Sequence, residues 1–178
     1  MSIVLLGSTS GSVTLQEPAV AGSTTLTLPA TTGIVMVSGN MPAVSAYPST
    51  NATISTATYT KVILNTEDFD TANAFDSTTN YRFTPQVAGY YQFNLVASMS
   101  QTASSNTNCH VALYKNGTAY KYGGQAFSAG TLANSSWSGL VSLNGSTDYI
   151  EMYVYTSAAT ATLVATYTSF TACLIRGA

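Results

Sequence analysis

The chain has 178 residues and a mass of 18.5 kDa, which is enough for one domain with its own core and a short appendage but not for two full domains. Charged residues make up only 7% of the sequence and the formal net charge is -2, so the few lysines and arginines cannot form the basic surface that nucleic-acid binding requires. No stretch approaches the roughly 18 apolar residues of a membrane span, and the short apolar run at the start lacks the length and the preceding positive charge of a signal peptide.

Residues 1–40 differ in composition from the rest of the chain. Stretches rich in Gly, Ser and Thr separate short apolar pieces such as Ile3–Leu6. None of these pieces can bury a core alone, so we expect an extended N-terminal arm that becomes ordered by strand pairing with other chains. The residues expected to make this attachment are Val13, Leu15, Leu26, Leu28, Ile34 and Val35.

From residue 41 onward, short alternating runs rich in Val, Ile, Thr, Tyr and Phe recur between clusters of Gly, Asn, Asp and Pro. This pattern predicts an all-β sandwich or barrel. The clearest strand is 90–99, because Tyr91, Phe93 and Leu95 fall on one face while polar residues fall on the other. We expect the face with the aromatic residues to lie in the core.

Three further strand units follow along the chain. Cys109–Lys115 runs into Asn116-Gly117, a dipeptide that tolerates the positive φ of a tight turn, so a hairpin is expected there. Leu140–Leu143 leads through an Asn-Gly-Ser turn into Asp148–Thr156, which predicts a second hairpin with tyrosines on its outer face. The last strand is expected at Thr166–Arg176.

The sequence also contains a recognisable set of motifs. Phe75-Asp76, then Tyr81–Pro85, then Ala88–Phe93 resembles the core signature of C1q and tumour-necrosis-factor (TNF)-like domains. Later pieces agree in order and spacing: 111–117, 143–145, 148–150 and 170–174. The resemblance covers residues 42–178 and implies an antiparallel jelly-roll sandwich that packs as a tight trimer.

A second resemblance concerns the arm. The stretch from Gly7 to Gly33 is similar to an N-terminal segment common in bacteriophage virion proteins. Together the two resemblances imply a homotrimeric structural protein of the virion, assembled in the host cytoplasm, of the capsid decoration, cement or head-fibre type. Its arm, residues 1–40, would dock on virion proteins such as the major capsid protein, and its C1q-like domain, residues 41–178, would project outward. The alternative is a receptor-binding tail fibre or tail-tip knob that recognises a host surface glycan or protein.

No enzyme is expected, because the chain lacks a convincing catalytic set. The one histidine, His110, lies in a strand beside serines, and a hydrolase would also need an orienting acid; an outward or interface position in a polar environment is expected for it. Cys109 and His110 should point to opposite faces of one strand, so they are not expected to ligate a metal together with Cys173. The two cysteines are expected to stay unbridged, and no cofactor is expected.

Four acidic residues lie close together in the sequence. Glu67, Asp68, Asp70 and Asp76 are expected in one loop-like stretch, where carboxylate oxygens are the ligands that calcium prefers. The regular acid spacing and glycine turn of a calcium loop are missing. A solvated acidic loop is therefore the favoured interpretation, and a calcium site built on Glu67, Asp68 and Asp70 is the weaker alternative.

Tyrosines are the remaining candidates for function. Tyr149, Tyr153 and Tyr155 on the outer face of the predicted second hairpin, together with Tyr90, are expected at the trimer interface, because exposed aromatic stripes mark such contacts. A platform for a receptor or a glycan is the alternative. Trp137 is either a core plug or a residue at the tip of the domain, and both readings stay open.

Overall fold

The computed structural model describes residues 3–16, 19–20, 22–23, 25, 27, 30, 35–37, 39, 41–101, 107–128 and 132–178. Contacts between Cα atoms divide the chain into two compact units, Met1–Ile34 and Val35–Ala178. Among the predicted attachment residues, Leu26, Leu28 and Ile34 lie outside the described part of the chain.

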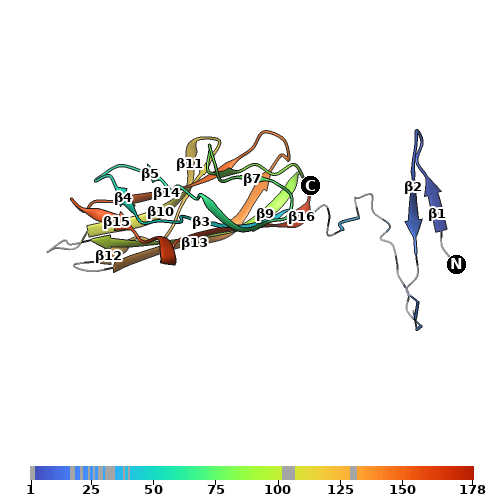
Figure 1. Cartoon of the computed structure of the whole chain (residues 1–178), viewed down its shortest axis with the longest axis horizontal. Coiled ribbons are helices and arrows are strands. Elements are labelled where there is room, and N and C mark those ends of the chain that lie inside the picture. Colours follow the sequence, from blue (N-terminus) through green and yellow to red (C-terminus); the bar gives the residue numbers. More distant parts are fainter. Residues whose placement is uncertain are drawn as a thin grey trace. The chain divides into compact units, whose positions relative to one another are not determined.

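The first unit contains an antiparallel hairpin made by β1 (Ile3–Leu6) and β2 (Ser12–Leu15), drawn in blue in Figure 1. The backbone N–H of Gly7 donates to the carbonyl oxygen of Gly11 at 2.9 Å and closes the turn. These two strands pair with each other, and the expected pairing of the arm with other chains stays a prediction. The physical reason for the hairpin is that the Gly- and Ser-rich turn lets two apolar runs fold back on one another.

The second unit is an antiparallel sandwich of two sheets, which Figure 1 shows as two stacked layers. Its elements are β3 (Ala43–Tyr47), β4 (Ala52–Ile54), β5 (Thr60–Lys61), β6 (Thr66–Asp70), β7 (Phe75–Asp76), β8 (Arg82–Phe83), β9 (Gly89–Gln101), β10 (Thr107–Lys115), β11 (Thr118–Tyr122), β12 (Ala126–Ser128), β13 (Leu132–Leu143), β14 (Ile150–Thr156), β15 (Ala161–Leu163), the 3-10 helix η2 (Ala165–Tyr167) and β16 (Ser169–Gly177). No helix within the described ranges is long and apolar enough to cross a membrane.

The described strands of the second unit form two sheets of seven strands each. The first, here called the β10 sheet, has the order β11-β10-β14-β8-β7, with β12 beside β10 and β5 beside β14. The second, the β9 sheet, has the order β4-β15-β9-β16-β3-β6, with β13 along the free side of β9. Every pair of named strands in the described residues is antiparallel, so the predicted all-β antiparallel sandwich is confirmed.

The core lies between the two sheets and follows the alternation seen in the sequence. The inward residues of β9 are fully buried, as predicted, and they include Tyr91 and Phe93. Phe83 on β8 packs its ring edge-on against both, with centroids 5.5 and 5.9 Å apart. The Tyr91 hydroxyl donates to the carbonyl oxygen of Val87 at 2.6 Å, and burial raises the pKa of this phenol to about 12. The phenol oxygen of Tyr91 is therefore buried in the core with a hydrogen-bond partner.

The structure confirms one predicted hairpin and corrects the other. β10 and β11 form the expected hairpin, and Asn116 and Gly117 take φ values of 54° and 75° in its turn. β13 and β14 do not pair with each other: β13 pairs with β9, β14 pairs with β10, and the chain between them crosses from one sheet to the other. Local alternation indicates a strand but does not select its neighbour, which depends on contacts far away in the sequence.

Candidate functional site

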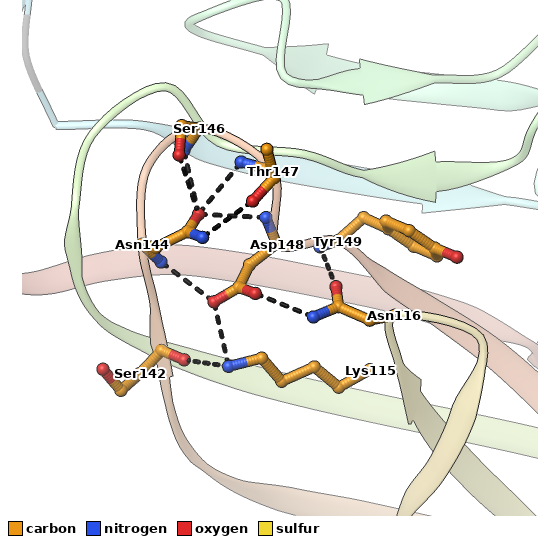
Figure 2. A network of polar contacts seen from close by, with 8 residues as sticks. All are labelled: Lys115, Asn116, Ser142, Asn144, Ser146, Thr147, Asp148 and Tyr149. Carbon is orange, nitrogen blue, oxygen red and sulfur yellow. Dashed lines mark hydrogen bonds and ion pairs between the residues drawn. The ribbon is translucent and has the colours of Figure 1, made fainter.

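Asn144 organises the loop that crosses between the sheets. Its side-chain oxygen accepts hydrogen bonds from the backbone N–H groups of Ser146, Thr147 and Asp148 at 3.0, 3.0 and 2.9 Å. Figure 2 shows these bonds converging on one atom. An Asn side chain that accepts from the backbone after it replaces the hydrogen bonds that a regular strand would supply, so the loop is held without regular structure.

Asp148 ties this loop to the β10–β11 turn. Its carboxylate accepts from the Lys115 ammonium at 3.0 Å, from the Asn116 amide at 2.8 Å and from the backbone N–H of Asn144 at 3.0 Å (Figure 2). The Asn116 side-chain oxygen in turn accepts from the backbone N–H of Tyr149 at 2.9 Å. The network is structural: it joins two loops at one end of the sandwich, and its polar atoms are engaged with each other.

We predict that Asp148→Asn lowers the free energy of unfolding by about 1 to 2 kcal/mol at neutral pH, because it removes charged hydrogen bonds in a partly exposed network. The hydrogen bond from Asn116, the first cause, and those from Lys115 and Asn144 lower the pKa of Asp148 below its ordinary value of 3.8. A lowered folded-state pKa stabilises the protein above the ordinary pKa, and this contribution disappears as the pH falls through the folded-state value.

Denaturant unfolding of both proteins between pH 7 and pH 2 checks this prediction. The gap between wild type and Asp148→Asn should stay constant down to about pH 4 and close below it. Asp68→Asn, on an exposed side chain of β6, is the matched control and should change stability by less than about 0.5 kcal/mol. A gap that persists at pH 2 would mean that the carboxylate charge is not what the network uses.

An aromatic cluster covers the outer face of the β10 sheet around Tyr59, which lies just before β5. The ring of Tyr59 lies 5.2 to 6.0 Å, centroid to centroid, from four neighbouring rings. These neighbours are His110, Tyr114, Tyr122 and Tyr155. His110 stacks on Tyr155 at 5.0 Å, and Tyr114 stacks on Tyr153 at 3.9 Å. Cross-strand aromatic pairs of this kind stabilise a sheet face without a second layer above it.

His110 lies inside this cluster on the outer face of β10 and is only 6% exposed. Its Nε2 lies 2.8 Å from the Tyr59 hydroxyl, and its Nδ1 lies 3.4 Å from the side-chain oxygen of Asn108. Burial lowers the pKa of His110 and raises that of Tyr59 to about 12, so both groups are neutral near pH 7. The consistent arrangement has the Tyr59 O–H donating to Nε2 while Nδ1–H points to Asn108.

The four predicted interface tyrosines do not form one patch. Tyr153 and Tyr155 are half-buried among the rings of the β10 sheet. The guanidinium carbon of Arg82 lies over the ring of Tyr149, 4.2 Å from the ring centroid. Tyr90 is exposed on β9 and therefore belongs to the other sheet. Because β9 and β14 belong to different sheets, these tyrosines do not share one face, and their place at the trimer interface stays a prediction.

The outer face of the β9 sheet is uncharged over β9 and the edge strand β13. Neither β9 nor β13 contains a charged residue. Hydrogen bonds run across the face from the Gln92 amide to the Ser138 hydroxyl at 2.9 Å, and from that hydroxyl to the Asn94 side-chain oxygen at 2.7 Å. Val96 and Leu140 add exposed apolar side chains to it. This combination of apolar groups with neutral, mutually bonded polar groups is typical of an interface core.

The four acidic residues occupy two strands and not one loop, which corrects the prediction; Asp76 lies on β7 of the β10 sheet. Glu67, Asp68 and Asp70 lie on β6 at the edge of the β9 sheet, where charges discourage pairing with another strand. Asp68 accepts from the Ser45 hydroxyl at 2.7 Å, and Asp70 accepts from the backbone N–H of Phe75 at 2.7 Å. In the part of the chain that the structure describes, no group of three or more His, Cys, Asp or Glu side chains could hold a metal ion.

The remaining candidates are placed in or beside the core. Cys109 is buried on β10 with its thiol 3.4 Å from the Gln101 side-chain oxygen, and Cys173 is half-buried on β16; both thiols are free. Trp137 on β13 is partly buried and packs against the core cluster. The structure therefore supports the core reading of Trp137.

Sequence reasoning missed Tyr59, Tyr114 and Tyr122 as parts of one cluster. The period-two alternation that places Val111 and Leu113 inward also places Tyr114 on the outer face of β10, so one member could have been found. Tyr59 is 51 residues from His110 in the sequence and lies outside any strand-like run, so no local signal pointed to it.

Comparisons with known proteins identify the fold. No family model and no curated protein matches the chain. Among solved structures, the globular domain of zebrafish complement 1qA protein is similar at a TM-score of 0.58 and 20% identity, over 77% of this chain and 99% of that one. Murine APRIL at pH 8.5 is similar at 0.53 and 12% identity, over 76% and 99% of the two chains. Eiger TNF from S. frugiperda is similar at 0.54 and 8% identity, over 78% and 93%.

These similarities confirm the predicted C1q/TNF-like jelly-roll fold. They cover about three quarters of the chain and nearly all of each solved domain, so the whole sandwich takes part and not one motif. At these identities the likeness is one of fold, and function depends on the surfaces described above.

Proposed function

We propose that the chain is a homotrimeric structural protein of a bacteriophage virion, of the capsid decoration, cement or head-fibre type. In this proposal the N-terminal unit docks on the assembled particle, and the jelly roll projects from it. The observation that carries the proposal is the β1–β2 hairpin, together with the similarity of residues 7–33 to an N-terminal segment of phage virion proteins.

One face of the hairpin consists only of apolar side chains. The register pairs Ile3 with Leu15 and Leu5 with Val13, so these four side chains lie together, and each is between 51% and 61% exposed. An isolated two-stranded hairpin is at best marginally stable in water, and an apolar face of this kind marks an interaction site. A virion protein such as the major capsid protein is the partner that this face would contact.

The trimer rests on the family resemblance and on the outer face of the β9 sheet. The C1q and TNF-like signature implies a tight trimer, and the face around Val96 is uncharged and partly apolar. The tyrosines of the β10 sheet already pack on one another, so they have less apolar area to offer a neighbour. We therefore place the interface on the side of Tyr90.

We also propose that the chain is not an enzyme. A hydrolytic mechanism would need a histidine whose free nitrogen faces a nucleophile. Here the one histidine, His110, is buried beneath tyrosine rings, and its Nε2 accepts from the Tyr59 hydroxyl. The described surfaces are suited to contact and not to chemistry.

Electron microscopy of phage particles that carry a labelled form of the chain tests the assignment. Label distributed over the capsid is the expected result. Label only at the tail tip would support the alternative, a receptor-binding tail fibre or knob, which the exposed aromatic rings of the β10 sheet favour. Particles without label would contradict both assignments.

A further inference from the structure

A depression of about 240 Å³ opens on the outer face of the β10 sheet, next to the aromatic cluster. It is lined by Tyr59, His110, Tyr122, Gly123 and Gln125. These residues come from the segment before β5, from β10, and from the end of β11 with the residues that follow it. Tyr59, which is 51 residues from His110, and the β10–β11 hairpin with the residues after it therefore meet at one hollow.

The floor of this depression is fixed to the rest of the domain. The backbone N–H of Gly123 donates to the carbonyl oxygen of Val111 at 2.8 Å, and the Ser135 hydroxyl donates to the carbonyl oxygen of Gly124 at 2.6 Å. A Cβ atom at Gly123 would lie 2.5 Å from the Val111 side chain and 2.6 Å from the carbonyl oxygen of Ser136. Glycine is required here, because only backbone without a side chain can lie this close to β10.

The groups that line the depression are neutral and of two kinds. Tyr122 contributes a ring that is 53% exposed, and Gln125 contributes an exposed amide that can donate and accept. No charged side chain lines the depression. Lys121, the cation of the same strand, lies instead over the ring of Tyr120. The site therefore offers an aromatic face and uncharged hydrogen-bonding groups.

We propose that this depression binds one neutral sugar ring. The C–H face of a pyranose carries small positive partial charges that fit the negative face of an aromatic ring, here that of Tyr122. Its hydroxyl groups need neutral donors and acceptors, which the Gln125 amide supplies. The volume is below the roughly 300 to 1,000 Å³ of pockets for drug-sized ligands, which suits a single ring at the end of a glycan.

Other ligand classes fit less well. A sialic acid or uronic acid would leave its carboxylate without a cation among the lining residues. A proline-rich peptide needs an extended aromatic groove along several residues, and this site is one compact hollow. The inference does not depend on attachment to a particle, because the site lies wholly within the second unit of the chain.

Saturation-transfer NMR on the full chain tests this inference. The probes are the methyl pyranosides of glucose, galactose, mannose and N-acetylglucosamine, a methyl sialoside, a methyl glucuronide and a proline-rich peptide. We expect transfer to the ring C–H protons of at least one neutral glycoside, with a dissociation constant in the millimolar range that is typical of small weak ligands.

Variants connect this signal to the depression. Tyr122→Ala should weaken binding at least tenfold and Gln125→Ala about fivefold, whereas Tyr122→Phe should retain most of the affinity because it keeps the ring. Tyr167→Ala is the matched control, since Tyr167 is 59% exposed on η2, outside the lining residues, and its removal should change nothing.

Four results would overturn the inference. They are no transfer to any neutral glycoside, binding of the charged glycosides alone, Tyr122-dependent binding of the peptide in place of sugar, and sugar binding that Tyr122→Ala leaves unchanged. A wild-type chain that binds sugar but does not attach to particles would contradict the proposed docking role and leave this site standing, so the two ideas fail separately.

Discussion

Under the proposed virion role, a chain that lacks residues 1–34 is expected to fold as a jelly roll and to lose all attachment to the phage particle. The second unit begins at Val35, and the core cluster is formed within it, so the deletion leaves the sandwich and the packing of Met36 intact. The hairpin β1–β2, with its apolar face, is removed entirely. Occupancy on purified particles, measured by quantitative labelling in electron microscopy, should fall from the wild-type level to background.

Point variants test whether the apolar face of the hairpin makes this contact. Leu5→Ser combined with Val13→Ser removes a cross-strand apolar pair from that face and should weaken attachment about a hundredfold or more, since each buried side chain contributes about 1.5 to 3 kcal/mol. Val4→Ser combined with Leu6→Ser is the matched control, because these residues lie on the opposite face. A truncated protein that decorates particles at wild-type occupancy would instead place the docking surface on the jelly roll.

Val96→Lys is expected to convert the proposed trimer into monomers. Val96 is 39% exposed on β9, and its register neighbours are Ser136 on β13 and Ser169 on β16, so it lies within the uncharged face. A trimer built on this face would bury three ammonium groups without counter-charges, at a cost of several kcal/mol for each ion. The assembly should therefore dissociate while the monomer stays folded.

Light scattering measures the outcome directly. Wild type should show about three times the 18.5 kDa chain mass, and Val96→Lys should show the mass of one chain. Tyr120→Lys, at an exposed residue of β11 in the other sheet, is the matched control and should remain trimeric. A wild-type protein that is monomeric at micromolar concentration would refute the trimer itself.

Local sequence patterns were sufficient for the clearest strands and for one turn. The alternation that buries Tyr91 and Phe93 depends on side chains that point to opposite faces of a strand, and no other part of the chain alters it. The Asn116-Gly117 turn depends on residues that tolerate positive φ. The motifs around Tyr81–Pro85 then led to the C1q/TNF-like fold that the solved structures confirm.

Only the tertiary structure decided which strands are neighbours and which surfaces result. Placing β13 beside β9 and β14 beside β10 separated Tyr90 from Tyr153, because hydrogen-bonded partners are selected by packing across the whole sandwich. The same packing brought Tyr59 onto His110 and created the depression beside them. Alternation with a period of two determines which face of the strand each side chain occupies. Its neighbours on that face depend on contacts between residues that are distant in the sequence.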